Sequence, residues 1–160
     1  MSKPFDAWTV LPHGELTKLE DNVMTVTGEL HMPLGDFPRR MTIVKLANGE
    51  VVVFSPIALN EVEMAKLVAF GEPTFMVVPS ARHRMDVKPW RDRFPSIRIF
   101  APRGAQESVA ELVPVEKGEP DFGDPNVRFV TMPGTEEHEA ALLVGSASGV
   151  TIVLNELIFN

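Results

Sequence analysis

Apolar and polar positions in the first third of the chain follow one another in the manner of antiparallel strands. "NVMTVTGEL" (22–30) has strand-forming residues without a fully polar face, and "RRMTIVKLANGEVVVFSPIAL" (39–59) holds two apolar runs that meet at Asn48-Gly49. Asn-Gly between apolar runs indicates a β-hairpin with a type I′ turn, because both central residues of that turn need positive φ. We therefore expect three consecutive antiparallel strands between Asn22 and Phe54.

The next segments alternate between helical and strand patterns. "LNEVEMAKLVAFG" has apolar residues at roughly helical spacing, with Asn60 placed to cap its start and Gly71 at its end. After it the sequence predicts a strand at 75–78, a polar loop at 79–86, a helix at 87–94 and a strand at 97–100, in the stretch "FMVVPSARHRMDVKPWRDRFPSIRIFAP". This order of strand, loop, helix and strand indicates a βαβα unit.

The last third of the chain predicts a short helix, a loop and three more strands. "GAQESVAELV" is the helix, 116–125 is a surface loop rich in Pro, Gly and acid, and "VRFVTMPG", "HEAALLVGS" and "GVTIVLNELIF" are the strands. "GSASGV" is interpreted as a hairpin turn, because no helical pattern follows it. An antiparallel meander followed by βαβα and more strands fits a mixed sheet, or two sheets flanked by helices, in an α/β (α+β) domain that spans 1–160.

Composition and charge remove several classes of function. The 160 residues have a net charge of −7, and the densest basic region, Arg82 to Arg93, alternates with Asp86 and Asp92. Nucleic acid is therefore not an expected partner, because phosphate neutralisation needs clustered cations. The sequence contains no membrane-span pattern and no signal peptide, which predicts a cytoplasmic protein. Because it contains no cysteine, any metal must be held by His and carboxylate.

Three residues are candidates for a metal site. His83 follows a buried strand, where loop residues commonly carry function, although a surface histidine is the simpler interpretation. His138 begins an apolar run, and Glu156 is an acid inside the apolar "TIVLNELIF", where it needs a partner, a ligand or solvent. Two histidines and a glutamate are a donor set that catalytic zinc sites use. Asp86, by contrast, is expected to cap the helix that follows it.

Four segments together resemble a known superfamily. "RRMTIVKLANGEVVVFSPIAL", "VVPSARHRMDVKPWRDRFPSIRIFAP", "HEAALL" and "TIVLNELIFN", in this order, are similar to a branch of the metallo-β-lactamase-like superfamily that has no known function. The similarity covers residues 20 to 160 and is most specific at Arg40 to Leu59. It implies an αββα sandwich with a metal site at the edge between its sheets. It also implies a further helix and histidine ligand beyond the last strand, so the fold is expected to be incomplete at the C-terminus.

The resemblance implies a degenerate metal site. The superfamily's His-x-His-x-Asp-His falls where this sequence has Ser80 to Asp86, and the His-His pair of the related branch becomes His83-Arg84. His138 matches a metal-ligating histidine, and Glu156 matches a bridging aspartate. The fixed positive charge of Arg84 disfavours a dication nearby by Coulomb repulsion.

Two functions are compatible with this pattern. The first is a non-catalytic or vestigial relative in which Arg82 and Arg84 bind a small anion such as a carboxylate or phosphate. The second is a hydrolase of an ester, thioester or lactone in which His83, His138 and Glu156 hold a single Zn²⁺. Cofactor content is therefore either none or one zinc ion. We also expect a homodimer, because half of a sandwich would leave the inner face of its sheet exposed, with further apolar residues near the terminus.

Overall fold

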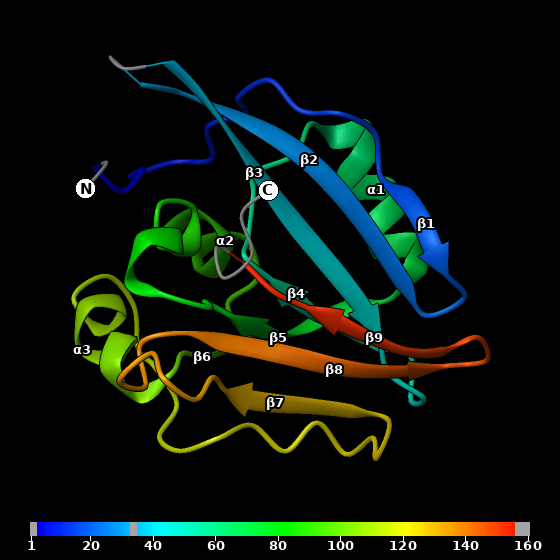
Figure 1. Cartoon of the computed structure of the whole chain (residues 1–160). Coiled ribbons are helices and arrows are strands. Elements are labelled where there is room, and N and C mark those ends of the chain that lie inside the picture. The colour runs from blue at the N-terminus through cyan, green and yellow to red at the C-terminus, as the bar shows by residue number, and fades with distance from the viewer. Residues whose placement is uncertain (1–2, 33–34, 156–160) are drawn as a thin grey trace.

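A computed structural model describes residues 3–32 and 35–155. Its elements are β1 (Thr17–Glu20), β2 (Val23–Met32), β3 (Gly35–Lys45), β4 (Glu50–Phe54), α1 (Glu61–Phe70), β5 (Glu72–Val77), the 3₁₀ turn η1 (Ala81–His83), α2 (Val87–Arg93), β6 (Arg98–Phe100), α3 (Arg103–Ala110), β7 (Val127–Thr131), β8 (Ala140–Ser146) and β9 (Gly149–Val153). Figure 1 shows how they are arranged. The predicted order of strands and helices is confirmed, with β1 as an additional strand.

The first sheet has six strands in the order β1-β2-β3-β4-β5-β6. Strands β1 to β4 pair antiparallel, whereas β4, β5 and β6 pair parallel through the α1 and α2 crossovers. The predicted hairpin joins β3 to β4, but its turn is not type I′, since Gly49 has a φ of +89° and Asn48 has no positive φ. Gly49 N–H donates to Leu46 O and Leu46 N–H to Glu50 O, which describes a three-residue loop.

Helix α1 has the ends that its sequence predicts. The Asn60 side chain accepts a hydrogen bond from Glu63 N–H, and Gly71 N–H donates to Leu67 O. At Gly71 the backbone is extended, so the glycine is not needed for its φ. It is needed for space, because a Cβ there would lie 2.5 Å from Val51 Cγ2 and 2.6 Å from Gly49 O.

Two apolar cores separate three layers. The three helices cover one face of the six-stranded sheet, in a core whose largest buried side chain is Trp90. The other face packs against the three-stranded sheet β7-β8-β9, with Phe54, Phe75 and Phe100 facing Phe129 and Leu142. Figure 1 shows β8 and β9 crossing in front of β4 and β5.

The expectation that the inner sheet face would be exposed is therefore wrong, because the same chain covers that face with β7–β9. Exposed apolar side chains lie instead on β9, where Val150 is 70% and Ile152 58% exposed. Both belong to the face of the three-stranded sheet that points away from the inter-sheet core, since Val153 and Thr151 alternate with them and Val153 is buried in that core.

Candidate functional site

Parallel pairing brings the carboxyl ends of β4, β5 and β6 to one edge of the large sheet. The loop after β5 runs from Val78 to Asp86 and contains the single turn η1, which is closed by a hydrogen bond from His83 N–H to Ser80 O. Ala140 N–H donates to Pro79 O, so the start of β8 is bonded to the same loop. This edge is where the sequence predicted the site, and His83 lies on it.

Ser55 is the first residue after β4 and has an unusual backbone. Its φ is +58°, in the left-handed region that non-glycine residues seldom adopt, and its N–H donates to Val77 O at 3.0 Å. A conformation of this kind costs about 1–3 kcal/mol and tends to occur at functional sites. The Ser55 Oγ lies 3.0 Å from Nδ1 of His83. Sequence reasoning missed Ser55, because "VFSPI" carries no sign of a positive φ.

Ser80 is a second serine on this edge. It is only 3% exposed, and its Oγ is buried with no hydrogen-bond partner among the described residues. A buried hydroxyl without a partner is costly unless something occupies its donor or acceptor positions. We therefore count Ser80 with Ser55 and His83 as the polar residues of the edge.

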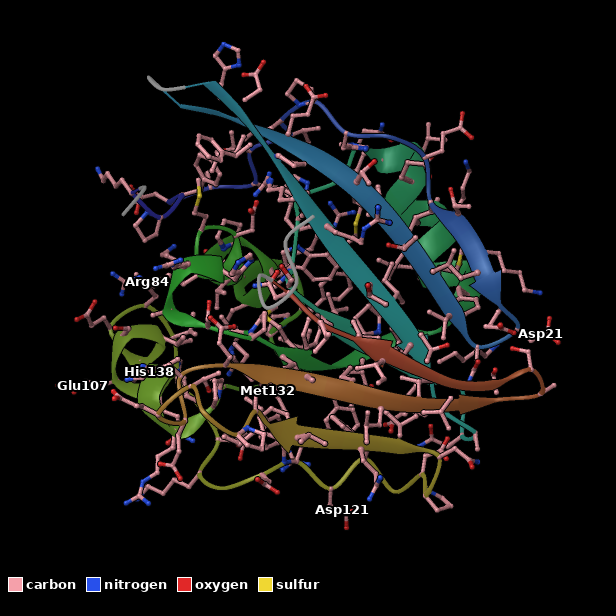
Figure 2. All side chains as sticks on the ribbon, viewed as in Figure 1. Asp21, Arg84, Glu107, Asp121, Met132 and His138 are labelled. Carbon is pink, nitrogen blue, oxygen red and sulfur yellow. The ribbon has the colours of Figure 1, made fainter. Side chains whose placement is uncertain are left out.

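The two candidate arginines lie in different surroundings. Arg82 is exposed on η1, whereas the side chain of Arg84 is 15% exposed. Arg84 Nη1 donates to Ser108 O and to Glu111 Oε2, both at 2.5 Å, so its guanidinium joins the loop to the end of α3 (Figure 2). The Arg84 Nε is buried and has no partner within the described part of the chain.

Asp86 occupies the position just before α2, as predicted, but it does not cap the helix. Its side chain is fully buried, and its carboxylate accepts from Arg39 Nη1 at 2.5 Å and from Ala58 N–H at 3.1 Å. Burial raises the pKa of the Asp86 carboxyl above its ordinary value, although Arg39 and the Ala58 N–H act in the opposite direction. The residue thus joins β3 and the segment after β4 to the site loop.

His138 lies in the connection from β7 to β8, next to α3 (Figure 2). It is exposed, and its ring rests on Gly104, where a Cβ would lie only 2.7 Å from Nδ1. Glu136 and Glu137, just before it, both have positive φ values of 51° and 62°. The turn that carries His138 is therefore strained, which the sequence did not indicate.

The predicted zinc ligands lie only partly within the described residues. Glu156 lies outside the described residues, and within the ranges 3–32 and 35–155 no three His, Cys, Asp or Glu side chains come together as a metal-binding group. At Nδ1 the partner of His83 is the hydroxyl of Ser55.

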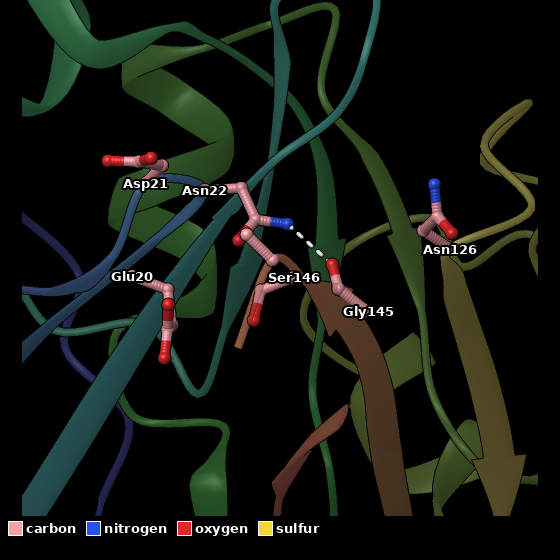
Figure 3. A pocket seen from close by; sticks show the side chains of 7 residues that line it. Glu20, Asp21, Asn22, Asn126, Gly145 and Ser146 are labelled. Atoms are coloured by element: carbon pink, nitrogen blue, oxygen red, sulfur yellow. Dashed lines mark hydrogen bonds between the residues drawn. The ribbon is translucent and has the colours of Figure 1, made fainter. Parts of the chain in front are cut away.

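A polar cavity of about 340 Å³ lies at the other end of β8 (Figure 3). The β1–β2 turn and the β8–β9 hairpin form it together with Asn126, and Asn22 Nδ2 donates to Gly145 O at 2.9 Å across it. It is lined by Glu20, Asp21, Asn22, Asn126, Gly145, Ser146 and Ala147. None of the predicted site residues lies there, so this cavity is separate from the edge.

None of the helices in the described ranges combines the length and apolar character that a membrane span requires.

Comparison with known proteins gives similarity in structure only. No protein-family model matches the chain, and no curated protein matches its sequence. The metallo-β-lactamase from Hirschia baltica superposes with a TM-score of 0.59 at 17% identity, over 84% of this chain and 67% of that one. The FIM-1 metallo-β-lactamase from Pseudomonas aeruginosa, in its mono-zinc form, gives 0.60 at 16% identity over 85% and 66%. That from Erythrobacter litoralis gives 0.62 at 15% identity over 81% and 65%.

At these identities the similarity concerns the fold and not the activity. The chain spans about two thirds of the length of these solved structures. Its mixed α/β architecture of helices and two packed sheets matches theirs over most of its own length. The chain has the metallo-β-lactamase-like fold.

Proposed function

We propose that this protein is a non-catalytic member of the metallo-β-lactamase-like fold that binds a small anion, a phosphate or a carboxylate, at the edge formed by the ends of β4, β5 and β6. The observation that carries the proposal is the presence of neutral and cationic hydrogen-bond donors in the site loop. Ser80 and His83 lie there with Arg82, while the described residues bring no three metal donors together. Groups of this type recognise anionic oxygens.

The two arginine candidates differ in exposure. Nη1 of Arg84 is already used by Ser108 O and Glu111, so an anion that bound Arg84 would have to compete with the Glu111 carboxylate. Arg82 is exposed on the same loop and also has an interaction of its own, so an anion would share its guanidinium, which can bind an anionic group in a bidentate manner. In this proposal Arg84 holds the loop against α3 and adds positive charge nearby.

The test is thermal unfolding of the protein with phosphate, sulfate or citrate, at an ionic strength matched with potassium chloride. At about 100 times Kd a ligand stabilises the folded protein by about 2.7 kcal/mol, or roughly 5–10 °C in a domain of this size. Arg82→Ala should weaken the binding about tenfold or more. Arg128→Ala is the matched control, because Arg128 is also exposed but lies on β7.

A single-metal hydrolase of an ester, thioester or lactone is the competing function. Metal analysis of protein purified without chelator separates the two proposals. Stoichiometric zinc, iron or manganese, together with no thermal shift for any of the anions, would overturn the anion-binding proposal.

A further inference from the structure

Four strands lie at the edges of the two sheets in the described part of the chain, and they differ in charge. Strand β1 contains Lys18, β6 begins with Arg98 and β7 contains Arg128. Strand β9, "GVTIV", contains no charged residue. Charged side chains on an edge strand discourage pairing with other chains, so β9 is the edge that lacks this protection.

The backbone groups of β9 point alternately to β8 and to the open side of the sheet. Gly145 N–H donates to Asn126 O, so the odd-numbered residues of β8 are bonded towards β7. The even-numbered residues of β8 are therefore bonded to residues 149, 151 and 153 of β9. The N–H and C=O groups of Val150 and Ile152 then point to the open edge of the sheet (Figure 1), where the described residues supply no backbone partner.

The side chains of the same two residues add apolar surface along this edge. Val150 is 70% and Ile152 58% exposed, and both lie on the outer face of the three-stranded sheet. Leu143 lies opposite Ile152 on β8 and is half-buried. A strand added at the open edge would therefore satisfy the free backbone groups and give Ile152 a second apolar neighbour beside Leu143.

We propose that β9 pairs antiparallel with β9 of a second copy of this chain, so that two three-stranded sheets become one six-stranded sheet across a two-fold axis. Complete overlap of the two strands puts Thr151 on the axis and Val150 opposite Ile152 of the second copy. Both residues of that pair have their N–H and C=O groups on the open edge, so the strand is complementary to itself. This interface is independent of the proposed anion binding.

Charge favours the antiparallel arrangement over a parallel one. The chain has a net charge of −7, so two copies repel each other unless they meet through uncharged surface. The acidic turn at Glu20 and Asp21 lies beside the β8–β9 hairpin, where Ser148 Oγ donates to Glu20. Antiparallel pairing places the two hairpin turns about 14 Å or more apart, beyond the Debye length of about 8 Å at physiological salt. Parallel pairing would bring the two acidic turns together.

Single-cysteine variants test the interface directly, because the sequence contains no cysteine. Residues 151 of the two copies would form a non-hydrogen-bonded pair with Cα atoms about 4.5 Å apart, a separation that a disulfide bridges. Thr151→Cys should therefore cross-link under mild oxidation about tenfold faster, or more, than Thr131→Cys. Thr131→Cys is the matched control, because Thr131 is also half-buried and lies on β7, the other edge strand of the same sheet.

A mixture of Val150→Cys and Ile152→Cys tests the register. Positions 150 and 152 of opposite copies would be about 5.5 Å apart, whereas like positions would be about 7–8 Å apart, at or beyond the reach of a disulfide. The mixed disulfide should therefore predominate. Equal rates for Thr151→Cys and Thr131→Cys would overturn the proposal, and so would a mixed disulfide no more abundant than the two like ones together. Light scattering of the wild type needs no variant to fold: a mass of twice 17.7 kDa at micromolar concentration supports the proposal, and 17.7 kDa overturns it.

Discussion

Removal of the Asp86 carboxylate tests how strongly the site loop is joined to the rest of the fold. Asp86 has no exposed side-chain surface, and its carboxylate accepts from Arg39 Nη1 and from Ala58 N–H. The Arg39 side chain is itself only 11% exposed, and its Nε and Nη2 have no partner among the described residues. Asp86→Ala would therefore remove the counter-charge that this buried guanidinium has among the described residues.

The expected loss is large because the remaining charge cannot reach solvent. Breaking a buried ion pair by removing one member costs about 3–5 kcal/mol, most of it from the uncompensated charge. In a domain of this size 1 kcal/mol shifts Tm by about 2–4 °C, so Asp86→Ala should lower Tm by roughly 6–20 °C. Asp92→Ala is the control, because the ion pair of Asp92 with Lys88 is exposed and contributes about 0.5 kcal/mol or less.

Urea unfolding followed by tryptophan fluorescence measures the loss of unfolding free energy in both variants, since Trp90 is fully buried in the helix-side core. A double variant shows whether the cost comes from Arg39. Arg39→Met combined with Asp86→Asn removes both charges and keeps an oxygen that accepts from Ala58 N–H, so this double variant should be more stable than Asp86→Ala alone. A loss below about 1 kcal/mol for Asp86→Ala, or a double variant that is no better, would refute the reasoning.

Three further predictions concern other parts of the fold. Burial raises the pKa of Glu63, but the hydrogen bonds from Lys66 and Leu16 N–H outweigh it and leave the pKa lowered. The stability that Glu63 contributes is therefore present above the unfolded pKa of about 4.3 and is lost as pH falls through the lower folded value. Glu63→Gln should cost about 1–2 kcal/mol at pH 7, and urea unfolding at several pH values should show this difference from the wild type disappearing in acid. Gly71→Ala should destabilise the fold by about 1–3 kcal/mol and so lower Tm in calorimetry, because its Cβ would overlap Gly49 O; an unchanged Tm would contradict the packing described for the end of α1. We expect a homodimer in which Val150 and Ile152 of one copy pack against those of a second copy. Ile152→Glu should then give monomers in light scattering, and a wild-type mass of 17.7 kDa would refute the dimer.

The parts of the fold that sequence could predict are those fixed by local chemistry. The hairpin at Asn48-Gly49 and the cap at Asn60 depend on residues within a few positions of each other, and both are present. The type I′ assignment was wrong because the loop has one positive φ, at Gly49, rather than two. Strand β1 was missed because "TKLE" is short and largely exposed, and it forms by pairing with β2 rather than through its own pattern.

Long-range partners explain what the sequence could not predict. An Asp just before a helix, as at Asp86, is typical of a helix cap. The Asp86 carboxylate is instead bonded to Arg39 on β3, 47 residues earlier. The sheet face that was expected to need a second subunit is covered by β7–β9 of the same chain. In both cases the local pattern gave no information about which distant residues would make the contact.

The same reasoning applies to the edge at which His83 lies. Resemblance placed His83 in the loop after β5, and the residue is there, but a histidine can act as a hydrogen-bond donor, an acceptor or a metal ligand according to the partner of its other nitrogen. That partner is Ser55, 28 residues earlier, at the end of the neighbouring parallel strand. A hydroxyl, unlike a carboxylate, can donate to Nδ1 as well as accept from it. Ser55 can be recognised as a partner of His83 only once β4 and β5 are seen side by side.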